Sequence, residues 1–275
     1  MTLDLGGNKL NSTSIGPEGQ ALKHIVKDGL VLHLDAANLN SYPGSGSTWY
    51  DLSGRGNHFS IGANITWNSA GYFNFNGGTL TGPASNASTF GFRTTNEHYI
   101  EVYAQVTSAA TNNFFNWQAT PSLGSDTRAI WSHFYYSNGN TYYDVDGCCD
   151  PTQRISYAND SDFTSGVKLA AWRTRTNTTP NRQFFKNTVS VMDSGAYSTA
   201  TVTWNLTTAA TIGNGWLGNL YSFKLYNRAL SDSEMQQNYN IERYRYAGGY
   251  YDCGYGCQYY LSNPGCASCT YIGPI

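Results

Sequence analysis

The sequence has few charged residues, and the two signs nearly balance. Only 12% of its 275 residues are Asp, Glu, Lys or Arg, and the formal net charge is -2 at pH 7. A protein that binds nucleic acid phosphates or an anionic membrane surface needs an excess of clustered Lys and Arg. We therefore expect neither nucleic acid nor a charged membrane surface as a partner.

Long apolar runs are missing as well. No stretch reaches the roughly 18 apolar residues of a membrane-spanning helix, so the sequence predicts no membrane insertion. Residues 1–14 also lack the basic start and the apolar core of a secretory signal. We therefore expect a chain that is not exported by that route.

The residues that are abundant favour strands and turns. Aromatic residues make up 15% of the chain, with 22 tyrosines, and Gly and Asn supply turns. Short runs of strand-forming residues are separated by Gly, Asn, Pro or Ser, at a spacing typical of a β-sandwich. The expected strands are Leu30–Asp35, His98–Val106, Asn113–Trp117, Ala129–Tyr136, Thr141–Val145, Arg154–Tyr157, Lys168–Arg173, Arg182–Phe185, Val189–Met192 and Thr199–Trp204.

The stretch Gly218–Tyr239 changes period halfway along. Its first half alternates, with Tyr221 and Phe223 on one face, which predicts a half-buried strand. Ser231 and Glu234 then form a capping-box pattern, in which each side chain can pair with the other residue's amide. The stretch therefore predicts a strand followed by one short helix.

This stretch, together with Gly29–Ala36 and Trp49–Asn57, resembles concanavalin A-like jelly-roll domains of the laminin-G-like type found in bacteriophage structural proteins. The resemblance covers roughly residues 29 to 242. It implies an all-β fold: a jelly-roll sandwich of two antiparallel sheets with one short C-terminal helix. It says little about activity, because this fold carries lectins, glycosidases, adhesins and scaffolds.

We divide the chain into an N-terminal arm, residues 1–28, the jelly roll, residues 29–245, and a Cys- and Tyr-rich appendage, residues 246–275. So small an appendage needs covalent or metal staples. Two disulfides of undetermined pairing are the favoured staple, and zinc is the alternative, at Cys253, Cys257, Cys266 and Cys269. The adjacent Cys148 and Cys149 could pair with each other only under strain, or be free or linked elsewhere.

Two features of the middle third suggest ligands. Asp144, Asp146 and Asp150 resemble part of a calcium loop, although Cys148 and the missing twelfth-position Glu depart from it, and Asp and Gly also simply make turns. Aromatic residues gather there beside Asn and Ser, and could stack on sugar rings or belong to the core. The candidate glycan-binding residues are Trp117, Trp131, Tyr135 and Tyr142.

Glutamate is too sparse for the usual glycosidase pattern of this fold. A glycosidase needs two carboxylates flanking the bond that it cuts. Jelly-roll glucanases place them along one strand as Glu-x-Asp-x-x-Glu, whereas here Glu97 and Glu101 have no Asp between them. We therefore predict that the chain is not an enzyme. If it were a hydrolase, Glu101 would be the best single candidate for a catalytic carboxylate.

The resemblance and the missing leader together favour a non-enzymatic structural protein on the surface of a bacteriophage virion, assembled in the host cytoplasm. It would be a head decoration, head fibre or tail-fibre component. Its expected partners are other virion proteins or copies of itself, and host-surface polysaccharide. The alternatives are a carbohydrate-binding module of a bacterial surface protein and a glycoside hydrolase.

Overall fold

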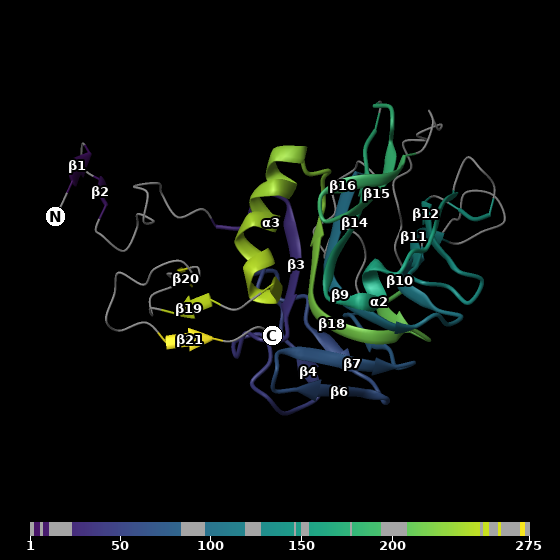
Figure 1. The fold of residues 1–275 in the computed structure, drawn as a ribbon, viewed down its shortest axis with the longest axis horizontal. Helices are drawn as coiled ribbons and strands as arrows, with labels where there is room; N and C mark the ends of the chain where they lie inside the picture. Colours follow the sequence, from purple (N-terminus) through teal and green to yellow (C-terminus); the bar gives the residue numbers. More distant parts are fainter. Residues whose placement is uncertain are drawn as a thin grey trace. The chain divides into compact units, whose positions relative to one another are not determined.

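The computed structural model describes residues 3–5, 8–10, 24–83, 97–118, 128–145, 147–149, 154–176, 178–193, 208–247, 250–252, 258–259 and 270–272. The chain divides into two compact units (Figure 1). One is Asp28–Asp232, and the other combines Met1–Lys27 with Ser233–Ile275.

The larger unit contains two antiparallel sheets. The first, called here the site sheet, has the order β13 (Arg154–Ala158), β12 (Asn140–Val145), β11 (Arg128–His133), β10 (Asn113–Gln118), β17 (Thr211–Asn214), β8 (Leu80–Thr81), β5 (Phe59–Ile61) and β4 (Thr48–Trp49). The second, the β18 sheet, has the order β16 (Val189–Asp193), β15 (Arg182–Lys186), β14 (Lys168–Thr174), β9 (His98–Ser108), β18 (Leu217–Tyr226), β7 (Tyr72–Asn76) and β6 (Ile65–Asn68), with β3 (Leu30–Asp35) also on β18. This arrangement confirms the predicted jelly-roll sandwich.

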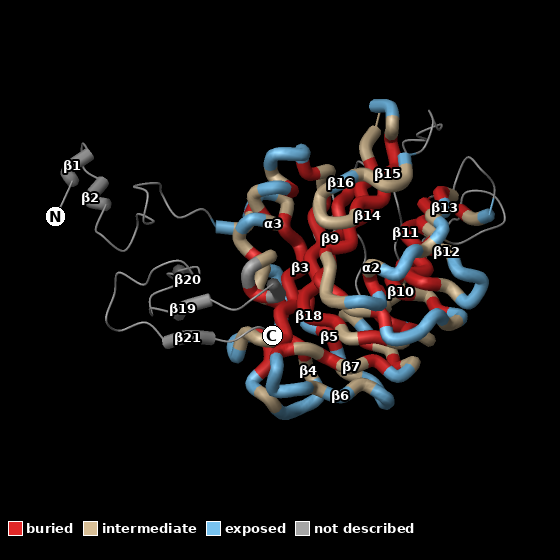
Figure 2. Tube along the Cα trace, viewed as in Figure 1, coloured by how far each residue is buried: buried red, intermediate tan, exposed pale blue. Residues whose placement is uncertain are grey.

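Alternation along the strands builds the core between the sheets (Figure 2). In the site sheet, one row of paired residues runs from Ile61 to Ile155 and consists almost entirely of apolar side chains. Burying this much aromatic surface is the main stabilising contribution to the fold. The largest fully buried side chains are Trp49, Trp117, Trp172, Trp216, Tyr99, Tyr103, Tyr143, Tyr226, Phe59, Phe73 and Phe75.

Strand β18 joins segments that are far apart in the sequence. It pairs along its length with β9, and on its other side with β7 through its first half and with β3 through its second half. Lys224 lies on the side of β18 that faces away from the core between the two sheets. It forms an ion pair with Glu101 at 3.2 Å, and neither side chain has exposed surface. The Glu101 carboxylate also accepts a hydrogen bond from the Tyr99 hydroxyl. Glu101, the best hydrolase candidate of the sequence, is thus a buried structural residue.

The loop after β4 covers the free edge of β3. Asp51 accepts hydrogen bonds from the amides of His33, Ser53 and Asn57 at 2.9, 2.9 and 3.0 Å. The Asn57 side chain in turn donates to the Val31 carbonyl at 2.7 Å. An unpaired strand edge invites association with other chains, so these bonds protect β3. The block Trp49–Asn57 therefore has a structural role at this strand edge.

The smaller unit contains all of α3 (Asp232–Ala247) except its first residue. This is the helix that the capping pattern predicted, although it is 16 residues long. The Asn238 side chain accepts from the Val26 amide at 2.8 Å. The other described strands of this unit are β1 (Leu3–Leu5), β2 (Asn8–Leu10), β19 (Tyr250–Asp252), β20 (Gln258–Tyr259) and β21 (Thr270–Ile272). The four cysteines at 253, 257, 266 and 269 lie outside the described residues.

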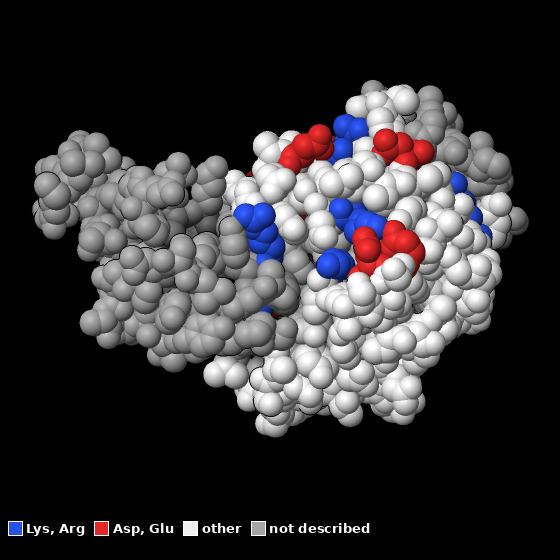
Figure 3. All heavy atoms as spheres, in the orientation of Figure 1, with Lys and Arg blue, Asp and Glu red and all other residues white. Residues whose placement is uncertain are grey.

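Few charges reach the surface of the described residues. In Figure 3 most of the visible side chains are neither acidic nor basic, as the composition predicted. None of the described helices is both long and apolar enough to cross a membrane. A second, short helix, α2 (Asp162–Ser165), buries Phe163.

Candidate functional site

The outward side of β10–β13 carries a continuous set of polar and aromatic side chains, called here the polar face. Strand pairing places Asn116, Trp131, Asp144 and Arg154 side by side across the four strands. Because side chains alternate along a strand, the residue two positions from Asp144, Tyr142, shares this face. The sequence folds this way because the alternate residues, such as Tyr143 and Val145, belong to the core.

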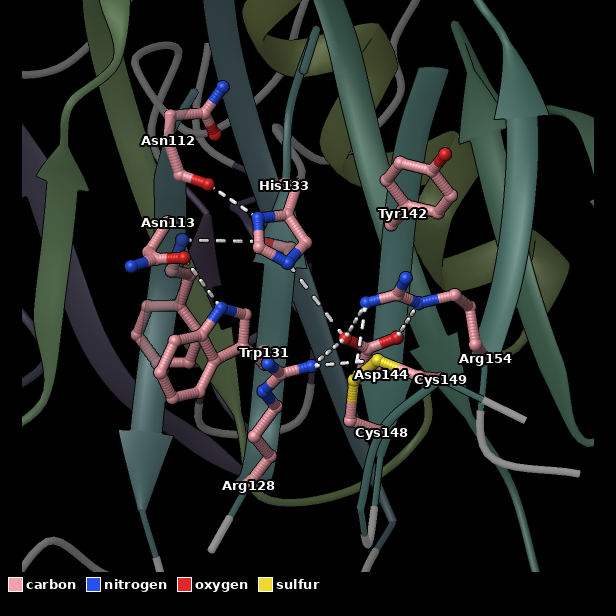
Figure 4. A network of polar contacts seen from close by, with 12 residues as sticks. Asn112, Asn113, Arg128, Trp131, His133, Tyr142, Asp144, Cys148, Cys149 and Arg154 are labelled. Carbon is pink, nitrogen blue, oxygen red and sulfur yellow. Dashed lines mark hydrogen bonds and ion pairs between the residues drawn. A yellow bond between two sulfur atoms is a disulfide. The ribbon is translucent and has the colours of Figure 1, made fainter. Parts of the chain in front are cut away.

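Asp144 lies at the centre of the polar face, and its side chain has no exposed surface (Figure 4). Arg154 binds both carboxylate oxygens, from Nε to Oδ1 at 2.5 Å and from Nη2 to Oδ2 at 2.6 Å. Arg128 donates from Nη1 to Oδ2 at 3.0 Å. A buried carboxylate is stable only when its charge and lone pairs are matched in this way. The two guanidinium groups therefore hold Asp144 in place.

The same arginines stack on the two aromatic rings of the polar face. The Arg128 guanidinium lies 4.7 Å from the ring centre of Trp131, and that of Arg154 lies 4.5 Å from the ring centre of Tyr142. Trp131 is also held by a hydrogen bond from Nε1 to the Asn113 side chain at 2.9 Å. These contacts fix the planes of both rings.

His133 lies between the two rings and is largely buried. Burial lowers the pKa of its imidazole from the usual 6.5, against the opposing effects of the Asn112 carbonyl and of Asp144. The neutral ring donates from Nδ1 to the Asn112 carbonyl. Its Nε2 then faces the Asp144 Oδ2 at 3.9 Å, too far for a hydrogen bond.

The hairpin between β11 and β12 adds amides to these rings. The side-chain amides of Asn138 and Asn140 both donate to the Tyr142 hydroxyl, at 2.7 and 3.0 Å. Tyr136 is half-buried, and its ring lies 5.1 Å from that of His133. Asn138 is exposed. The hairpin therefore presents aromatic surface and hydrogen-bonding groups together at the end of the polar face.

Past the end of β12, Cys148 and Cys149 are joined to each other by a disulfide. The sequence left this pairing open. Arg154 Nη2 lies 3.5 Å from the sulfur of Cys148, and Arg128 Nη1 lies 3.6 Å from that of Cys149. The disulfide thus contacts both arginines that hold Asp144.

The four predicted glycan-binding residues do not lie together. Trp131 and Tyr142 are on the polar face. Trp117 is a fully buried core residue, and its Nε1 donates to the Thr208 carbonyl at 2.9 Å. Tyr135 also belongs to the core, and burial, followed by the Asp160 charge, raises the pKa of its hydroxyl to about 12. Neither ring can meet a sugar in this arrangement.

The predicted calcium loop is described only in part. Asp144 is held by Arg128 and Arg154, which occupy the oxygens that a cation would need. Asp146 and Asp150 lie outside the described residues. Among the residues that the structure describes, no three His, Cys, Asp or Glu side chains are grouped as a metal site.

Several residues of the polar face were not predicted. Arg128, His133 and Arg154 come from neighbouring strands, and only the strand register brings them to Asp144. The single sequence signal for them is the alternation within each strand, which does not reveal which strands are neighbours.

Comparison with known proteins shows the fold and no closer relationship. No family model and no curated protein matches the chain. A solved structure of Trypanosoma rangeli sialidase in complex with sialic acid matches with a TM-score of 0.60 and 14% identity, over 83% of this chain and 35% of that one. The binding domain of botulinum neurotoxin DC, in complex with rat synaptotagmin II, matches with a TM-score of 0.57 and 12% identity, over 82% and 57%.

These matches show that the chain shares a β-sandwich fold with parts of those proteins. This chain spans about a third of the length of the sialidase chain that it matches. At such low identity the likeness extends to the fold alone.

The prediction that the chain is not an enzyme is wrong. The matched structures include several of Trypanosoma rangeli sialidase, one of them a covalent intermediate with 2,3-difluorosialic acid. The fold therefore occurs within enzyme chains. The absence of one carboxylate pattern excluded only one route of hydrolysis, and it was too narrow a basis for excluding catalysis.

Proposed function

We propose that the chain binds glycans through the polar face of β10–β13 and the β11–β12 hairpin. The observation that supports this most directly is the hairpin, where the half-buried rings of Tyr136 and Tyr142 adjoin the amides of Asn138 and Asn140. A sugar offers an apolar ring face for stacking and hydroxyls for hydrogen bonds. The hairpin offers the complement of both.

The side chains of this surface are already ordered. Tyr142 is stacked by Arg154 on one side and bound at its hydroxyl by two amides. Each of those amides has a second N–H in addition to the one that Tyr142 accepts. Little side-chain freedom is left to lose on binding, which favours affinity. The fold likeness to a sialidase solved with sialic acid gives further support.

A glycan array tests the proposal. The full chain is expected to bind a subset of glycans, and Tyr142→Ala to lower the affinity about tenfold or more, the loss expected for one stacked ring with its hydroxyl. Tyr50→Ala is the matched control, because Tyr50 is an exposed tyrosine, 42% exposed, outside the polar face. Absence of binding to every glycan by a correctly folded chain would reject the proposal.

The setting that we propose is a bacteriophage particle, on which the chain is displayed beside other virion proteins or copies of itself. Its support is the resemblance of the blocks around Asp51 and Phe223 to phage jelly rolls. A carbohydrate-binding module of a bacterial surface protein is the second candidate, and the glycan-binding surface supports it equally. A protein inventory of purified virions separates the two, since the first requires this chain to be present.

A further inference from the structure

The disulfide between Cys148 and Cys149 lies partly at the surface and contacts the two arginines of the polar face. Cys149 is exposed and Cys148 is half-buried. The segment is held to β11 by a hydrogen bond from the Gly147 amide to the Arg128 carbonyl at 2.9 Å. The disulfide is therefore both accessible and attached to the strand that carries Trp131 and His133.

The two sulfurs share their nitrogen partners with Asp144. Arg154 Nη2 lies 2.6 Å from Asp144 Oδ2 and 3.5 Å from the sulfur of Cys148. Arg128 Nη1 lies 3.0 Å from the same oxygen and 3.6 Å from the sulfur of Cys149. In the disulfide these sulfurs are neutral and are weak acceptors. The carboxylate therefore keeps the stronger hold on both arginines.

Reduction changes that competition. A thiolate is a full negative charge, and nearby guanidinium groups favour it over the neutral thiol. Two thiolates beside Arg128 and Arg154 would compete with Asp144 for the same N–H groups. Any displacement of Arg154 also removes the group that stacks on Tyr142.

We propose that Cys148–Cys149 is a reversible redox site that sets the glycan affinity of the polar face, high when oxidised and low when reduced. A thiolate of the reductant attacks the Cys149 sulfur, the S–S bond breaks, and the Cys148 thiolate leaves beside Arg154. A second thiol group of the reductant then displaces Cys149. The reductant, a dithiol, becomes a disulfide and releases its two protons to solvent, and the protein gains two electrons as the Cys148 and Cys149 thiolates.

The chemistry of this site does not depend on the proposed function, but its effect on affinity does, so the test reads both. The full chain is treated with dithiothreitol, and alkylation followed by peptide mass spectrometry shows whether residues 148 and 149 become free thiols. Hydrogen exchange of the β11–β13 amides and affinity for an array-selected glycan are measured before reduction, after it and after reoxidation. The control is the double variant Cys148→Ser and Cys149→Ser, which keeps Cys253, Cys257, Cys266 and Cys269.

The expected result is a fall of about tenfold in affinity on reduction, faster exchange in β11–β13, and recovery of both on reoxidation, in the unmodified chain only. Faster hydrogen exchange on reduction in a chain that binds no glycan would reject the proposed function. It would still support redox control of the structure of the polar face. Equal effects in the double variant would assign the response to the other cysteines and overturn the proposal. So would free thiols at both positions in the oxidised protein, or no change on reduction.

Discussion

Arg154 binds both oxygens of Asp144, at 2.5 and 2.6 Å, and thereby joins β13 to β12 on the outward face of the site sheet. The carboxylate is fully buried, whereas the Arg154 side chain is 22% exposed. The charge of Asp144 is therefore compensated by a residue that is itself within reach of solvent.

Removing Arg154 should destabilise the fold. Arg154→Ala leaves the buried Asp144 carboxylate with Arg128 at 3.0 Å and the more distant His133 at 3.9 Å as the ion-pair partners that Figure 4 draws. The change should lower the free energy of unfolding by about 2–4 kcal/mol. Urea denaturation measures this, with the exposed Arg55→Ala as control. Equal stability of the two variants would show that the ion pair contributes nothing.

Protonation of His133 should oppose folding. Burial lowers the pKa of His133 below 6.5 in the folded chain, so the unfolded chain binds the proton at higher pH. The contribution of this histidine to stability is therefore present above pH 6.5 and decreases as the pH falls below it. An NMR titration of the imidazole should give a midpoint under 6.5, and His133→Gln should remove this part of the pH dependence. A midpoint above 6.5 would contradict the burial argument.

Acid should weaken the contact of Asp160, which lies just before α2, with Lys186 at the end of β15. Burial raises the pKa of Asp160, but hydrogen bonds from Lys186, Tyr157 and the Asp162 amide outweigh it and lower the pKa to about 2. The stabilisation is therefore complete above the usual 3.8 and is lost as the pH falls through about 2. Because the Asp160 side chain is 40% exposed, solvent screening keeps the effect small. Stability curves of the chain and of Asp160→Asn should converge in acid, and parallel curves would refute this.

Asp51 should matter more for stability than an exposed aspartate. Asp51→Ala leaves the amides of His33 and Asn57 without their acceptor, at a cost of about 1–3 kcal/mol for each buried group. Asp28→Ala is the control, because Asp28 is 72% exposed and its ion pair with Arg228 is at the surface. Thermal unfolding should separate the two variants clearly. A similar small shift in both would mean that water replaces the Asp51 carboxylate.

The sequence predicted a strand correctly where the residues of that strand alone determine its position. Leu30–Asp35 was predicted with the bounds that the structure shows for β3, and the predicted strand His98–Val106 lies within β9, which ends two residues later at Ser108. Strand β11 was predicted to continue to Tyr136, but it ends at His133. Tyr135 adopts a φ of 55°, a left-handed conformation that ends the strand and that the sequence does not reveal.

The polar face was less accessible to prediction because it depends on pairing between strands. Trp117 and Trp131 were both predicted as glycan-binding residues, yet Trp117 lies in the core and Trp131 on the outward side of the site sheet. Asp144 was considered as either a calcium ligand or a turn residue from its neighbours in sequence, whereas its partners Arg128 and Arg154 are 16 and 10 residues away. The register of β11, β12 and β13 determines which side chains meet Asp144. A pattern within one strand does not predict the register between strands.

The position of β18 also constrains the order in which the chain folds. β3, β7 and β9 all pair with a strand that begins at residue 217, so none of these three edges is complete until that strand has left the ribosome. Contacts of such long sequence separation also close slowly. A nascent chain that stops short of β18 therefore presents three open strand edges at once, and its yield should depend on chaperones that shield them during synthesis.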